Sequence, residues 1–154
     1  MIDNNRNIII HPGGSDFIKR CILDLVNLCK QFDKRRLELK NNLGRISYQK
    51  EFGLVKVYTA RQTGHTTAQF QILREDDNAC MLSWNEKTNK RWKKENPDIK
   101  DRVFTTYNFN KPCNIMKFQK YKLVLVDCAS YNKYVDEIIE TCSYIDDCIC
   151  VLVG

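Results

Sequence analysis

The sequence predicts an α/β fold in which a mainly parallel, five-stranded sheet lies between two layers of helices. Short segments rich in β-branched residues alternate with helix-like segments, which is the pattern of a parallel sheet with crossover helices. The segment Leu123–Val126 is apolar at every position, as expected for a central strand buried on both faces. The chain has 154 residues, of which 43% are hydrophobic, so it can bury a substantial core as one domain, 1–154.

The strands and helices of this core follow from composition and from turn residues. We expect strands at 54–58, 79–84, 103–107, 123–126 and 148–153. We expect helices between them at 66–74, 85–95 and 132–142. The segment 108–118, which contains Pro112, is the longest expected irregular link.

The first third of the chain predicts one long helix. Apolar residues recur at three- and four-residue steps from Phe17 to Phe32, and Ser15 is a favourable N-cap. We expect this helix to continue through the basic residues 34–36 and to end at 41–44, where asparagine and glycine permit a left-handed residue. Residues 1–50 would then form an N-terminal helical segment, and residues 51–154 the α/β core.

Composition excludes several classes of protein. No apolar run approaches the ~20 residues that span a bilayer, and the first residues lack a secretory signal, so we expect a cytoplasmic protein with no membrane partner. The net charge of +6 permits nucleic-acid contact without requiring it. Eight cysteines without a CxxC pair indicate reduced, structural thiols. With His11 and His65 as the only histidines, no structural zinc site is expected.

The segment that follows the first core strand carries the main functional signal. A strand, a tight loop and a helix N-terminus form a place where backbone N–H groups converge and the helix dipole is positive, which suits phosphate. The phosphate-binding pattern is G-x-x-x-x-G-K-[ST]. This chain has Thr59 at the first glycine position, keeps Gly64 and Thr66, and has His65 in place of lysine. A helix cap without a ligand remains the alternative interpretation of this segment.

The loop Arg61-Gln-Thr-Gly-His-Thr-Thr67 resembles the Walker A loop of viral (phage) large terminases and helicase-like ATPases, which have the P-loop NTPase fold. Asp127, at the end of an apolar strand, resembles the acid that supports Mg²⁺ in that family. The resemblance implies that ATP or another nucleotide binds with Mg²⁺ in the cytoplasm of a host cell. It also implies roles for individual residues: Thr63, Gly64, His65, Thr66 and Thr67 contact the phosphates, Thr66 and Asp127 hold Mg²⁺, and Arg61 and Asp127 are the catalytic candidates.

Two departures from the family pattern predict weak or absent ATP hydrolysis. The family lysine is a permanent positive charge, whereas a histidine side chain, with an ordinary pKa near ~6.5, is mostly neutral at cell pH. The family also places a glutamate after the strand aspartate to polarise water, and this chain has Cys128 there. Loss of either group is expected to cost orders of magnitude in rate, because phosphoryl transfer depends on charge stabilisation and positioning.

Two alternatives of other classes remain open. The chain is either a catalytically dead P-loop module that binds a host or viral protein, or a nucleic-acid-binding accessory protein. The second alternative rests on a basic, aromatic segment, which could equally be a solvated helix with Trp92 as its core anchor. Its candidate contact residues are Lys90, Arg91, Trp92, Lys93 and Lys94. The length leaves no room for a nuclease domain or a second motor domain, so we expect a bare core.

Overall fold

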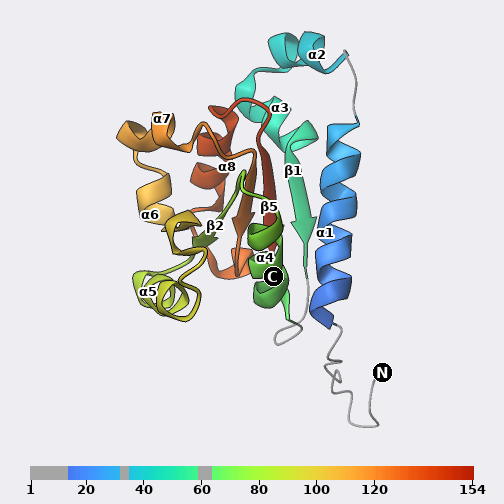
Figure 1. Ribbon diagram of the computed structural model, residues 1–154. Helices are drawn as coiled ribbons and strands as arrows, with labels where there is room; N and C mark the ends of the chain where they lie inside the picture. Colours follow the sequence, from blue (N-terminus) through green and yellow to red (C-terminus); the bar gives the residue numbers. More distant parts are fainter. Residues whose placement is uncertain (1–13, 32–34, 59–63) are drawn as a thin grey trace.

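The computed structural model describes residues 14–31, 35–58 and 64–154, and it has an α/β fold with three layers (Figure 1). The five strands form one all-parallel sheet in the order β1-β5-β4-β2-β3. Their bounds are β1 Leu54–Val57, β2 Ala79–Ser83, β3 Val103–Thr105, β4 Leu123–Val126 and β5 Ile149–Val153. The predicted fold class is therefore confirmed, and all five predicted strands are present.

Helices cover both faces of the sheet, and alternate residues of each strand point to different layers. In β4, Leu123 and Leu125 join one core cluster, whereas Val124 and Val126 join the other. The first cluster is closed by α1 (Gly14–Lys30), α4 (His65–Glu75) and α5 (Glu86–Glu95). The second is closed by α6 (Thr106–Phe109), α7 (Ile115–Phe118) and α8 (Val135–Ser143). This two-sided burial explains why β4 is apolar throughout.

The N-terminal segment differs from the prediction, because it is not one continuous helix. Helix α1 ends at Lys30, and a separate helix α2 (Arg35–Leu43) follows, then α3 (Arg45–Phe52). The apolar stripe of α1, which includes Ile22, packs on the sheet and on α4, whereas Leu39 and Leu43 of α2 are exposed. The expected left-handed end is confirmed, since Gly44 has φ +77° between α2 and α3.

The link 108–118 is more ordered than expected, and this order shortens β3. The side chain of Thr105 accepts a hydrogen bond from the N–H of Asn108 and thereby caps α6, so the strand ends two residues before the predicted position. A 3-10 turn, η2 (Pro112–Asn114), then leads into α7. The short helices α6 and α7 cover the outer edge of the second layer.

Candidate functional site

The candidate site lies at the carboxyl edge of the sheet, where β1 and β4 end. Strand β5 lies between them and pairs in parallel with both, with Val57 opposite Val153 and Val126 opposite Leu152. Since parallel strands end at a common edge, the start of α4, which follows β1, comes next to Asp127, which follows β4. The fold therefore brings together two segments that are far apart in the sequence, as is typical of ligand sites in open α/β sheets.

Asp127 is the buried centre of this site, with only 2% of its surface exposed. Its Oδ1 accepts hydrogen bonds from Thr66 Oγ1 at 3.1 Å and from Gln69 Nε2 at 2.6 Å. Its Oδ2 accepts one from Cys128 Sγ at 3.3 Å. These donors compensate the carboxylate for its loss of water, which a buried acid requires.

His65 and Cys128 complete a cluster around that carboxylate. His65 Nε2 lies 3.5 Å from Asp127 Oδ1 and 4.0 Å from Cys128 Sγ. One donor atom from each of the three side chains falls within 4.8 Å of the others, which is close enough to share a metal ion. Cys128 is held in the left-handed region, with φ +51°. No pattern in the sequence predicts that His65 lies beside a cysteine.

Gly64 sets the start of α4 against the start of α1. It is the N-cap of α4 and has φ +87°, a conformation that favours glycine. A Cβ at this position would lie 3.2 Å from both the backbone nitrogen and the Cβ of Ser15, in the first turn of α1. The N-termini of two helices of 17 and 11 residues therefore meet beside the cluster, and their dipoles add to the positive potential there.

The structure brings together most of the residues that the sequence predicted for this site. Gly64, His65, Thr66 and Asp127 are adjacent, whereas Thr67 is exposed and takes no part in the hydrogen bonds of Asp127. Arg61 and Thr63 lie outside the described residues.

Sequence reasoning missed the contribution of Gln69, which is fully buried and also donates to the His65 carbonyl at 3.3 Å. A signal for it was present. Gln69 lies four residues after His65, next to the buried Ala68 and one turn before the buried Ile72, so a polar residue there required a partner.

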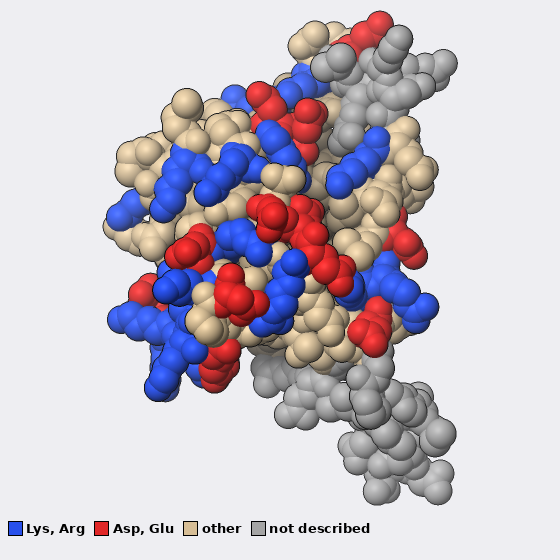
Figure 2. Space-filling view, viewed as in Figure 1, with Lys and Arg blue, Asp and Glu red and all other residues tan. Residues whose placement is uncertain are grey.

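The basic segment predicted as a nucleic-acid contact forms α5. Figure 2 shows its Lys and Arg side chains gathered at the lower left of the molecule, interspersed with acidic groups. Lys90 pairs with Glu86 at 4.0 Å. Trp92 is only 4% exposed, and its ring packs edge-on against Phe70 at 5.4 Å between centroids. Its ring is therefore a core anchor and is not accessible for stacking on a base, which leaves the four basic residues on a solvated helix face.

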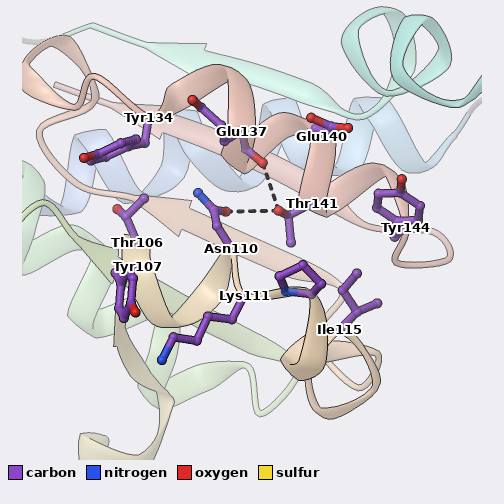
Figure 3. Close-up of a pocket in the computed structure, with 11 residues that line it drawn as sticks. Thr106, Tyr107, Asn110, Lys111, Ile115, Tyr134, Glu137, Glu140, Thr141 and Tyr144 are labelled. Atoms are coloured by element: carbon purple, nitrogen blue, oxygen red, sulfur yellow. Dashed lines mark hydrogen bonds between the residues drawn. The ribbon is translucent and has the colours of Figure 1, made fainter.

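A separate cavity of about 620 Å³ lies between α8 and the α6–α7 segment (Figure 3). Its lining includes three tyrosines, Tyr107, Tyr134 and Tyr144, and two acids of α8, Glu137 and Glu140. A hydrogen bond of 3.0 Å from Thr141 to Asn110 crosses its floor. The cavity shares no residue with the Asp127 cluster and is mostly apolar, so it has no evident role in phosphate or metal binding.

Comparisons with protein-family models, with curated proteins and with solved structures gave no match. The functional assignment therefore depends on the geometry of the site. No helix within the described residues is both long and apolar enough to pass through a bilayer.

Proposed function

We propose that this chain is a small, degenerate P-loop NTPase-like protein that binds a nucleotide or another phosphate ligand with Mg²⁺ and hydrolyses it weakly or not at all. The observation that carries the proposal is the 3.1 Å hydrogen bond between Thr66, at the start of α4, and Asp127, at the end of β4. A hydroxyl and a carboxylate in contact at a helix N-terminus provide oxygen ligands for Mg²⁺ beside a site for anions.

The phosphate would lie at the N-terminus of α4. The first turn of α4 points its backbone N–H groups toward this position, and the start of an α-helix supplies no intrahelical acceptors for such groups. The left-handed Gly64 carries no side chain that would obstruct the approach of an anion. The neighbouring N-terminus of α1 adds to the positive potential. Mg²⁺ would be held by Thr66 and Asp127 and would bridge to the phosphate oxygens.

The positions of His65 and Cys128 support weak hydrolysis. The ring of His65 lies 3.5 Å from the carboxylate of Asp127, and an imidazole does not supply the permanent positive charge of a lysine. Cys128 donates its thiol proton to Asp127, and a thiol is a poor substitute for the carboxylate that polarises water. The lysine that stabilises charge on the phosphates and the glutamate that polarises water in that family are therefore both replaced in this chain.

Isothermal titration calorimetry with ATP, ADP and inorganic phosphate, each with Mg²⁺, tests the proposal. We expect saturable binding of at least one of these ligands, and Thr66→Ala should weaken it at least ~10-fold, the effect of losing a metal ligand and its hydrogen bond. Thr88→Ala is the matched control, because it removes the same hydroxyl from the first turn of α5, and Thr88 is not one of the residues that donate to Asp127. Absence of binding heat with all three ligands, or equal binding by wild type and Thr66→Ala, would contradict the proposal.

A further inference from the structure

We propose that His65, Asp127 and Cys128 form a binding site for one divalent transition-metal ion, with zinc as the best fit. This inference goes beyond the proposed nucleotide site and does not depend on it, because it concerns an ion bound by side chains alone. It also departs from the expectation drawn from the sequence, in which His11 and His65 were too few and too scattered for a zinc site. The tertiary structure brings His65 next to Cys128 and Asp127.

The donor atoms lie near the separations of a tetrahedral zinc site. Zinc binds sulfur at about 2.3 Å and nitrogen or oxygen at about 2.0–2.2 Å, so tetrahedral ligand atoms are separated by roughly 3.3–3.6 Å. Cys128 Sγ lies 3.3 Å from Asp127 Oδ2, His65 Nε2 lies 3.5 Å from Asp127 Oδ1, and the sulfur and the nitrogen are 4.0 Å apart. The carboxylate contacts involve different oxygens, and one ligand atom from each of the three side chains lies within 4.8 Å of the others. The side chains would therefore have to approach one another by up to about 1 Å to bind one ion.

The chemistry of the three donors selects zinc over magnesium. A thiolate and an imidazole are soft or borderline ligands that zinc accepts readily, whereas Mg²⁺ prefers oxygen in an octahedral arrangement. Three protein ligands leave one tetrahedral position open, as in zinc sites that bind water or a substrate. The side chain of His65 is 13% exposed, so the cluster is reached from solvent on that side.

The surrounding structure already holds the carboxylate in place. Thr66 and the fully buried Gln69 both donate to Asp127 Oδ1, which is the kind of outer contact that orients metal ligands. The backbone of Cys128 has φ +51°, a strained conformation for a non-glycine residue, and its thiol donates to the carboxylate of Asp127. Such strain is typically retained where a local geometry is functional.

A cysteine nucleophile activated by histidine is the main competing interpretation of the same cluster. In such a pair, one ring nitrogen faces the thiol and the carboxylate orients the ring through the other nitrogen. Here both Asp127 Oδ1 and Cys128 Sγ lie nearest to the same atom, His65 Nε2. Convergence of three donors on one point is the geometry of a metal site, and it does not orient a base.

Metal titration of the whole chain tests the proposal. Reduced protein, freed of metal with a chelator, would be titrated with Co²⁺ and then with Zn²⁺ in the absence of nucleotide. We expect one equivalent to bind, a sulfur-to-cobalt charge-transfer band in the near ultraviolet, and displacement of cobalt by zinc. Cys128→Ser should abolish the band, and both Cys128→Ser and His65→Gln should weaken zinc at least ~10- to 100-fold, the range known for the loss of weaker outer contacts.

Cys113→Ser is the matched control, since Cys113 is an exposed cysteine on η2, and it should leave zinc affinity unchanged. Circular dichroism would establish that each variant is folded. A wild-type protein that binds no equivalent of zinc, or a folded Cys128→Ser variant that binds it as tightly as wild type, would overturn the proposal. Because nucleotide binding is measured with Mg²⁺ and no zinc, failure of one proposal is distinguishable from failure of the other.

Discussion

The hydroxyl of Thr66 donates to Oδ1 of Asp127 at 3.1 Å, across 61 residues of sequence. Gln69, one turn further along α4, donates to the same oxygen at 2.6 Å. One helix therefore supplies two donors to a single buried carboxylate at the end of β4. This relationship fixes the first turn of α4 against the sheet, and it makes Asp127 the group on which both proposals depend.

Replacement of Gln69 by leucine should destabilise the protein by about 2–3 kcal/mol. The change removes the shortest hydrogen bond to the buried carboxylate of Asp127. Removing the donor of a hydrogen bond costs more stability when the acceptor is ionised than when it is neutral. Urea unfolding monitored by circular dichroism measures the change. Gln71→Leu is the matched control on the same helix: the Oε1 of both glutamines is buried without a hydrogen-bond partner, but of the two it is Gln69 that donates to Asp127, so we expect little loss of stability at Gln71. Equal effects of the two substitutions would contradict the role assigned to Gln69.

Alanine at Gly64 should cost more stability than alanine at Gly44. Both glycines have positive φ, +87° and +77°, so each substitution carries a backbone penalty of roughly 1–2 kcal/mol. At Gly64 the new Cβ would also approach Ser15 at 3.2 Å, whereas at Gly44 no atom lies within 4 Å. Denaturant midpoints of the two variants give the difference between their losses of stability. This difference measures the cost of the contact between the new Cβ and Ser15, where α1 packs against α4. If Gly44→Ala lost as much stability as Gly64→Ala, the packing of α1 against α4 at this position would not be tight.

The cysteines should differ sharply in reactivity toward iodoacetamide. Burial raises the pKa of the Cys80 and Cys142 thiols well above the ordinary value, so both remain protonated and inaccessible near neutral pH. Cys113 is exposed and should be alkylated first. Mass spectrometry of peptides after brief labelling of the native protein gives the order, and labelling in denaturant should remove the difference. Rapid native alkylation of Cys80 would contradict the buried position that the structure assigns to it.

Stability should fall between pH 10 and pH 12 because of Tyr121. Burial raises the pKa of Tyr121 to about 12, against about 10 in the unfolded chain. The unfolded state therefore loses this proton first, and the native state loses up to about 2–3 kcal/mol of relative stability as the pH rises through this window. This loss of stability is measured from the urea midpoints of wild type and Tyr121→Phe at pH 9 and at pH 11.5. The phenylalanine variant should lose less stability over this interval, and identical losses would contradict the prediction.

Much of the fold was predictable because local sequence and tertiary environment agree. The all-apolar segment Leu123–Val126 can only be stable as a strand covered on both sides, and it is β4, buried at every position. Asn85 was placed at the start of a helix, and its side chain accepts a hydrogen bond from the N–H of Thr88 at 2.7 Å. The prediction of a single N-terminal helix was wrong because an apolar stripe in the sequence does not show where the surface that it packs against ends. Among the described residues, α1 contributes to the core cluster and α2 does not.

The candidate site was predictable only in part. A glycine before a helix and an acid after a strand are local signals, and Gly64 and Asp127 were identified from them. The proximity of Cys128 to His65, and of Gln69 to Asp127, depends on the strand order, since β5 places the end of β4 next but one to the end of β1. No spacing along the chain encodes that order.

The sequence alone determined the α/β class, the five strands and the two segments that supply the site, because each depends on residues close together in the chain. Only the tertiary structure decided that Trp92 is a core residue, and only it decided that a thiol, an imidazole and a carboxylate converge on one point. The physical reason is that periodicity and capping act over one or two turns of chain. Donor atoms 63 residues apart are brought to 4.0 Å only when a parallel sheet aligns the ends of its strands.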